Sequence, residues 1–219
     1  MSRSFDQSSE DSAQIWRNIV LPELQRRCPG IYTRVEGDPH PVCQILDRQC
    51  GIDYLFTDGQ VTYGVAWRVQ VGPKNWRTFT IRQERQSGAT TEAEKLSRAF
   101  VRDGIMPHFT VQAYVGANDA LLGFARVPTH NLIRVSEVHG YEDETGESQK
   151  GQASFWVVPW DCVLRQGYSV IEYDGAIGDF VHGSFVERDP ETWPKACHPW
   201  CKKNLPTLTL GKKGQQEAA

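Results

Sequence analysis

The stretch from Gly51 to Gln70, GIDYLFTDGQVTYGVAWRVQ, is typical of a β-hairpin. Two strand-like runs flank Asp58-Gly59, and an Asp-Gly pair in this position is the strongest short-range signal for a hairpin turn. Side chains alternate between the two faces of a strand, so one face of the return strand carries Trp67 between Val65 and Val69. The other face carries Ala66, Arg68 and Gln70. This polar face has to be explained.

Helices and further strands are predicted around the hairpin. In SAQIWRNIVLPELQRRC the apolar residues recur at helical spacing, with Ser12 suited to cap the helix and Pro22 to kink it. The run WRTFTIR is expected to pair back on the hairpin, and SGATTEAEKLSRAFVRDG predicts a helix capped by Thr90 or Thr91 and ended at Gly104. HFTVQAYV, LLGFARV and SFWVVPW are predicted strands, and PTHNLIRVSEV and DCVLRQG are predicted short helices.

This order of elements predicts an α/β fold with a single mixed central sheet flanked by helices. The chain has 219 residues, 39% of them hydrophobic, which is enough for one substantial core. We expect one domain over residues 12–201. A disordered polar N-terminus over 1–11 and a flexible tail over 202–219 complete the chain.

Composition limits the classes of partner and compartment. The net charge is −3 with 23% charged residues, so a nucleic-acid site would have to be a local basic patch. Six irregularly spaced cysteines fit a reducing compartment. The sequence has no apolar run that predicts a signal peptide or a membrane span, so we expect a cytoplasmic protein.

The sequence GID, entering a hairpin with polar residues on its return strand, resembles the PD-(D/E)XK nuclease superfamily when taken with the flanking helices. The similarity is to its Holliday-junction-resolvase-like and restriction-endonuclease-like members, and it covers residues 12 to 115. In that superfamily an Asp at the hairpin entrance converges with a Glu-x-Lys pair on the return strand. The resemblance implies a restriction-endonuclease-like core, carboxylates that hold Mg²⁺, and a Lys that positions or activates the attacking water.

Carried over to this chain, the Asp falls on Asp53 and Glu-x-Lys falls on Ala66-Trp67-Arg68. The acid is therefore replaced by Ala66 and the lysine by Arg68, while a glutamine such as Gln70 replaces the lysine in some members. In some restriction enzymes the missing acid has moved to the following helix. The candidate catalytic residues are thus Asp53, Arg68, Gln70 and Glu92, with Asp53 and Glu92 as metal ligands.

Three questions stay open at these positions. The second acid beside Asp53 could be Glu36 or Glu92. Arg68 could instead be a structural cation paired with Asp53, and Glu92 could simply complement the helix dipole. Arginine cannot act as a general base at neutral pH, so a catalytic Arg68 would act by electrostatics.

A basic segment follows the third predicted strand. Arginines before a glycine break and a threonine at a helix N-terminus favour phosphate. The candidate DNA-binding residues are Arg77, Arg82, Arg85, Thr91 and Lys95. Other features have less support: CHPWC (197–201) lacks the second pair that zinc needs, and late tryptophans are typical of a core or its rim.

The expected function is Mg²⁺-dependent phosphodiester cleavage in DNA. The alternative is a catalytically inactive nuclease-fold module that binds nucleic acid or a protein partner, including a second copy of the chain. A small-molecule-binding domain of another α/β fold would follow if Asp53 pointed into solvent.

Overall fold

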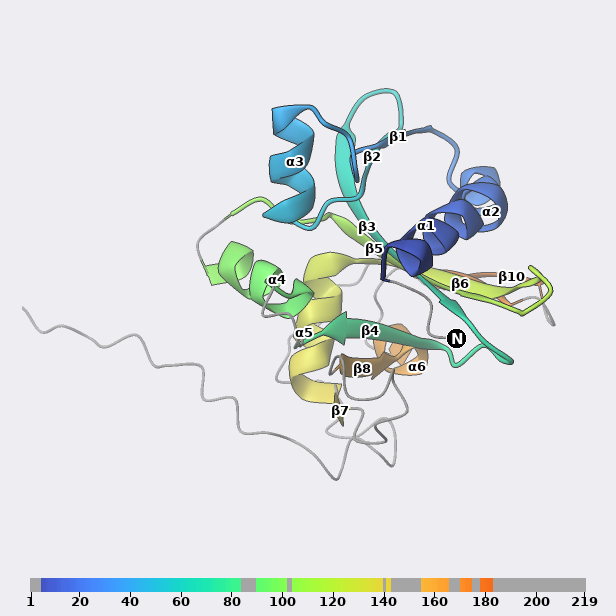
Figure 1. Cartoon of the computed structure of the whole chain (residues 1–219). Coiled ribbons are helices and arrows are strands. Elements are labelled where there is room, and N and C mark those ends of the chain that lie inside the picture. The colour runs from blue at the N-terminus through green and yellow to red at the C-terminus, as the bar shows by residue number, and fades with distance from the viewer. Residues whose placement is uncertain are drawn as a thin grey trace, which may run out of the picture.

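A computed structural model describes residues 5–83, 90–101, 104–139, 141–142, 155–165, 170–174 and 178–182. Its strands form two sheets (Figure 1). The larger, mixed sheet has the order β1-β2-β3-β5-β6-β9-β10, with β1 Ile31–Arg34, β2 Tyr54–Thr57, β3 Thr62–Val71, β5 Phe109–Val115, β6 Leu121–Pro128, β9 Val170–Asp174 and β10 Gly178–His182. The smaller has the order β4-β8-β7, with β4 Thr78–Arg82, β8 Phe155–Pro159 and β7 Tyr141–Glu142.

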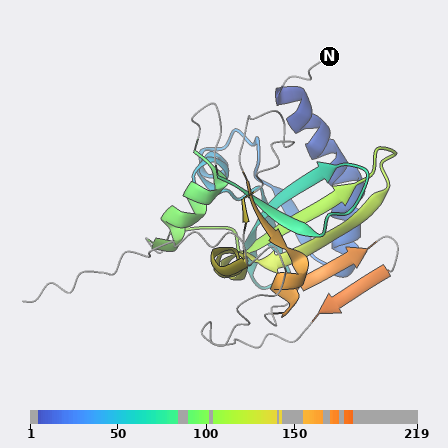
Figure 2. The same cartoon turned by 90° about the horizontal axis from the view of Figure 1, so that it is seen from below.

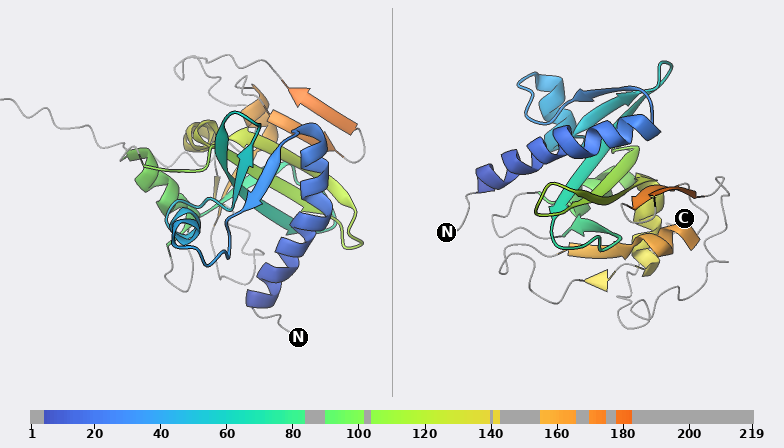
Figure 3. Two further views of the ribbon diagram at one scale, coloured as in Figure 1. Left: turned by 90° about the horizontal axis from the view of Figure 1, so that it is seen from above. Right: turned by 90° about the vertical axis from the view of Figure 1, so that its right-hand side faces the viewer.

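A long N-terminal helical segment covers one face of the larger sheet (Figure 3). It runs through α1 (Phe5–Ile15), a π-helical turn η1 (Trp16–Val20) and α2 (Leu21–Arg27). The helix begins at Phe5 and not at Ser12, so residues 5–11 belong to it. Pro22 is the second residue of α2, just after the π-helical turn. Because proline lacks a backbone N–H, it cannot donate the helical hydrogen bond at this position. Trp16, Val20 and Leu24 are fully buried against the sheet.

The hairpin forms where the sequence predicts it. β2 and β3 pair antiparallel from Tyr54↔Val65 to Thr57↔Thr62. The Asp58 carboxylate accepts hydrogen bonds from the N–H groups of Gln60 and Val61, both at 3.0 Å. Gly59 has φ +100°, a conformation that glycine adopts without steric cost.

The next neighbour of β3 in the sheet is β5, in parallel, from Val65↔Phe109 to Val71↔Val115. Parallel neighbours need a crossover connection, and α4 (Glu92–Val101) lies on it. Thr91 and Glu94 form a capping box at its start: the Thr91 hydroxyl accepts the Glu94 N–H at 3.3 Å, and the Glu94 carboxylate accepts the Thr91 N–H at 2.9 Å. Thr91, one of the two predicted caps, is therefore the residue that caps this helix.

The prediction of one sheet is wrong for WRTFTIR. This segment forms β4, which leaves the hairpin and pairs antiparallel with β8, from Thr78↔Pro159 to Arg82↔Phe155 (Figure 2). The edge of β3 that it would need is occupied by β5. Phe79 and Ile81 of β4 are instead buried in a second core.

This second core lies on the other face of the larger sheet from the N-terminal helices. It joins residues of β4, β6 and β8 to α5 (Thr129–His139) and α6 (Trp160–Arg165). The remaining helix, α3 (Pro41–Arg48), has no buried residue and precedes the hairpin. None of the helices in the described ranges combines the length and apolar character needed to cross a bilayer.

Candidate active site

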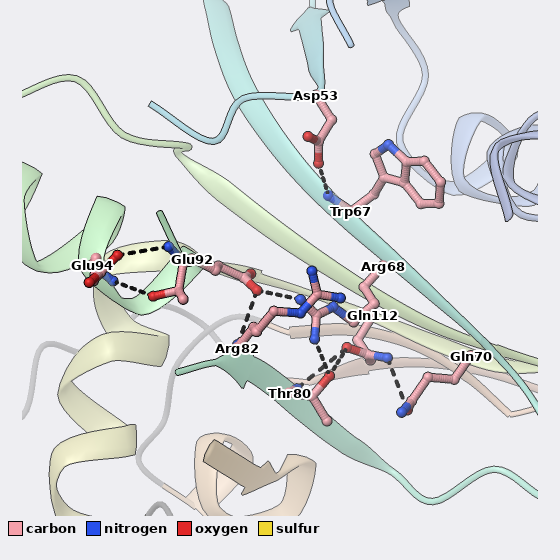
Figure 4. A network of polar contacts seen from close by, with 10 residues as sticks. Asp53, Trp67, Arg68, Gln70, Thr80, Arg82, Glu92, Glu94 and Gln112 are labelled. Atoms are coloured by element: carbon pink, nitrogen blue, oxygen red, sulfur yellow. Dashed lines mark hydrogen bonds and ion pairs between the residues drawn. The ribbon is translucent and has the colours of Figure 1, made fainter. Parts of the chain in front are cut away.

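The alternation along β3 separates two environments, as the sequence predicts. Val65, Trp67 and Val69 face the N-terminal helices, where Trp67 stacks on Trp16 with ring centroids 5.0 Å apart. Arg68 points the other way, toward β4, and donates to the Thr80 hydroxyl at 3.1 Å. The polar face of β3 therefore lines the space between the two sheets (Figure 4).

Asp53 is held at the entrance to β2 by three backbone contacts. Its N–H donates to the Val65 carbonyl at 2.9 Å, and its own carbonyl accepts from Val35 at 2.9 Å and Glu36 at 3.0 Å. Its carboxylate accepts the Trp67 N–H at 2.8 Å. These bonds fix the side chain against the first part of β3.

The electrostatic surroundings of Asp53 disfavour its charged form. Burial raises its pKa well above the usual range of an aspartate, and the negative charges of Glu36, Glu92 and Asp47 raise it further. The Trp67 hydrogen bond acts in the opposite direction. A carboxyl group held among other acids in this way has a deficit of positive charge around it.

Of the two candidate second acids, Glu36 is the one whose backbone N–H donates a hydrogen bond to the Asp53 carbonyl. Its pKa is also raised, mainly by burial, although Arg34 lies 3.8 Å away and acts to lower it. The Glu36 Oε2 atom is buried without a hydrogen-bond partner, and so is the indole Nε1 of Trp67. Glu36 and Asp53 are thus neighbours through a backbone hydrogen bond, and the Glu36 charge acts on the Asp53 carboxyl group.

Glu92 reaches the same face of β3 but has other partners. Its carboxylate forms an ion pair with Arg68 and accepts the Arg82 N–H at 3.3 Å. Arg68 is therefore paired with Glu92, and not with Asp53 as the alternative reading of the sequence expected. The Arg68 guanidinium also lies 5.2 Å from the Phe155 ring centroid, within cation–π range. Glu92 is thus the first residue of α4 and the ion-pair partner of a β3 side chain.

A row of amides completes this polar layer. The Gln112 Oε1 atom accepts from the Thr80 hydroxyl at 3.2 Å and from the Thr80 N–H at 3.4 Å. Its Nε2 donates to Gln70 Oε1 at 3.2 Å. Sequence reasoning missed Gln112, although a polar residue inside the apolar run FTVQAYV was a usable signal.

The predicted DNA-binding residues that the structure describes, Arg77, Arg82, Thr91 and Lys95, have different partners. The capping box takes up the hydroxyl and N–H of Thr91. Lys95 donates to the Asp47 carbonyl at 2.9 Å and so ties α4 to α3. Arg82 lies 5.5 Å from the Phe155 ring centroid, beside Arg68, whereas Arg77 lies 5.9 Å from that of Trp160.

Several sequence candidates fall elsewhere. Arg85, the CHPWC segment, Trp193 and the tail 202–219 lie outside the described residues. Trp160 is fully buried in the second core, as predicted for a late tryptophan. The Nδ1 atom of His108 accepts the Gly64 N–H at 3.0 Å, which gives this histidine a structural role.

The carboxyl pair fits Mg²⁺ by its donor chemistry. The described residues contain no group of three His, Cys, Asp or Glu side chains suited to a metal ion. Magnesium, however, is usually held by one or two carboxylates, with water and substrate phosphate oxygens completing its shell. Glu36 and Asp53 meet that requirement by the number and type of their donors, and the Glu36 Oε2 atom accepts no hydrogen bond although the Arg34 guanidinium lies 3.8 Å away.

No protein-family model, curated protein or solved structure matches this chain. The function is therefore inferred from the residues of the site and their geometry.

Proposed function

We propose that this protein cleaves phosphodiester bonds in DNA with Mg²⁺, on a restriction-endonuclease-like core. The observation that carries the proposal is the half-buried pair Glu36 and Asp53 at the entrance to the hairpin, joined by a backbone hydrogen bond and beside the β3 segment that leads to Arg68. The order of elements supports it. A helical segment, three antiparallel strands, a helix and a strand parallel to the third succeed one another, with α3 inserted after the first strand and β4 after the third.

In this proposal Glu36 and Asp53 hold the metal. Bound Mg²⁺ would supply an activated water and neutralise charge on the phosphate. The raised pKa values of both carboxyl groups mean that protons compete for the same oxygens, so metal affinity should rise with pH. Partial burial of the pair also reduces its contact with water, which strengthens its attraction for a cation.

Arg68 supplies fixed positive charge. It remains protonated at any physiological pH and cannot accept a proton from water. Its ion pair with Glu92 and its bond to Thr80 hold the guanidinium between the sheets. Its role in cleavage would be to stabilise charge that develops on the reacting phosphate.

A second candidate function is a nucleic-acid-binding module without cleavage. Ala66 offers no oxygen where the family has its second acid, and Arg68 already has an anionic partner in Glu92. Both observations favour loss of chemistry with retention of the fold. The same surface would then bind DNA, or a protein partner, without cutting.

Cleavage and metal binding are tested separately. Purified protein is incubated with single-stranded, duplex and branched DNA in Mg²⁺, Mn²⁺ or a chelator. We expect metal-dependent cleavage that Asp53→Asn and Glu36→Gln abolish, while Glu10→Gln, a change to an exposed acid of α1, leaves it intact. Terbium luminescence excited through Trp67 reports metal binding without any turnover, and both site variants should lose it.

Each outcome of these assays points to one reading. Binding of DNA without cleavage by the wild type replaces the enzyme with the binding module. Cleavage that survives Asp53→Asn shows that the site is elsewhere. A wild type that neither binds nor cuts any of the three DNA forms refutes both candidate functions.

A further inference from the structure

Gln112 is a neutral polar side chain in the centre of the larger sheet. It is 1% exposed and lies on β5 in register with Arg68 of β3. A buried amide without partners costs free energy, so its hydrogen bonds determine how it is oriented. Three hydrogen bonds link its amide group to β3 and β4 (Figure 4).

The chemistry of these bonds leaves one orientation for the amide of Gln112. The backbone N–H of Thr80 can only donate, so the atom of Gln112 that faces it has to be the carbonyl oxygen. The Thr80 hydroxyl accepts a hydrogen bond from Arg68 and donates its own hydrogen bond to the Gln112 carbonyl oxygen. The NH₂ group of Gln112 is therefore directed at Gln70.

The orientation of Gln70 follows from that of Gln112. A group facing the NH₂ of Gln112 has to accept, so Gln70 turns its carbonyl oxygen inward, at 3.2 Å. Its NH₂ group is then the part of the amide left for other partners. Gln70 is an exposed residue, unlike Gln112.

We propose that Gln112 is a positioning residue that holds the Gln70 amide with its NH₂ outward, as a fixed neutral donor to a phosphate oxygen of bound DNA. The proposal rests on the DNA binding proposed above and deepens it. Arg68, two residues before Gln70 on the same face of β3, gives the site its cation. Gln70 adds a donor whose direction is set before the ligand arrives.

A neutral donor has a signature that distinguishes it from a cation. Removing a Lys or Arg that contacts phosphate lowers both the affinity and the salt dependence of binding, because fewer counterions are released. Removing a glutamine donor lowers the affinity at every salt concentration and leaves the salt dependence unchanged. A purely structural residue would instead affect folding.

The experiment measures binding of fluorescein-labelled duplex DNA by anisotropy, in chelator, over a series of salt concentrations. We expect Gln70→Ala to bind about ten- to a hundredfold more weakly, since one hydrogen bond to a charged group is lost. The slope of log affinity against log salt should stay at the wild-type value. Gln112→Glu should weaken binding at least as much, because a carboxylate only accepts and makes Gln70 turn its NH₂ inward.

A double variant tests the positioning role of Gln112. In a Gln70→Ala background, Gln112→Leu should cause no further loss of affinity, once circular dichroism and thermal unfolding show that both proteins are folded. A further loss would assign Gln112 to general structure and overturn the positioning role. Wild-type affinity in Gln70→Ala would overturn the inference while the proposed function stands, whereas a wild type that binds no DNA refutes the proposed function itself.

Discussion

The ion pair between Glu92 and Arg68 gives a sharp test of how α4 is attached to the larger sheet. Glu92→Ala removes two bonds to a carboxylate: the contact with Arg68 and the 3.3 Å bond from the Arg82 N–H. Hydrogen bonds to charged groups contribute about 1.5–3 kcal/mol each. The side chains of Arg68 and Glu92 are 19% and 26% exposed, so the solvent weakens the pair below a fully buried one.

We therefore expect Glu92→Ala to lower the free energy of unfolding by about 2–3 kcal/mol, or roughly 4–12 °C in melting temperature. The assay is urea unfolding followed by tryptophan fluorescence, which is sensitive to the stacked pair of buried Trp16 and half-buried Trp67. Glu94→Ala is the matched control. It removes an acid from the same helical turn and part of the capping box, which should cost only about 0.3–1.5 kcal/mol.

A double-mutant cycle with Arg68→Ala isolates the pair itself. The two changes should show a coupling energy of about 1 kcal/mol or more, because each removes the same interaction. If Glu92→Ala costs no more than Glu94→Ala and the coupling is zero, Glu92 merely complements the helix dipole and the reasoning above fails.

Three further perturbations test other parts of the structure. The pKa of Asp53 is raised on folding, so its contribution to stability is complete below its unfolded pKa and is lost as the pH rises through its folded pKa. Urea titrations should show Asp53→Asn gaining stability relative to the wild type as the pH rises above the usual range of an aspartate, and a constant difference would contradict this. Thr91→Ala should lose about 1 kcal/mol in the same assay through loss of the cap, with Thr91→Ser close to the wild type. Gly123→Ala would place a Cβ atom 2.6 Å from the Tyr173 carbonyl oxygen and should cost about 1–3 kcal/mol. Gly72→Ala, with open space around it, is its control in thermal unfolding.

The hairpin and the two faces of β3 could be predicted because their signals are local. Asp58-Gly59 marks the turn, and strand alternation alone separates Trp67 from Arg68. The capping box at the start of α4 is also a local signal, because it involves only Thr91 and Glu94, three residues apart. Each of these features depends on neighbours in sequence, so no knowledge of the tertiary structure is needed.

The place of β4 could not be predicted in this way. Its alternating apolar residues Phe79 and Ile81 suit either sheet equally well. The outcome depends on β5, which occupies the edge of β3, and on β8, which offers another edge. The partners of Gln112 are likewise set by register between distant strands, so the sequence shows a polar residue in an apolar run but not what it binds.

The pairing of β4 with β8 also affects the order in which the protein can be completed during synthesis. Roughly 70 residues separate Arg82 from Phe155, and a ribosome adds about 5–20 residues each second. For several seconds, therefore, the emerging chain holds the hairpin and Asp53 while β4 has neither its ladder partner nor the Phe155 ring that lies over Arg68. The side of the site nearest Glu36 and Asp53 can form early in synthesis, whereas the surroundings of Arg68 are completed only when the much later strand β8 arrives.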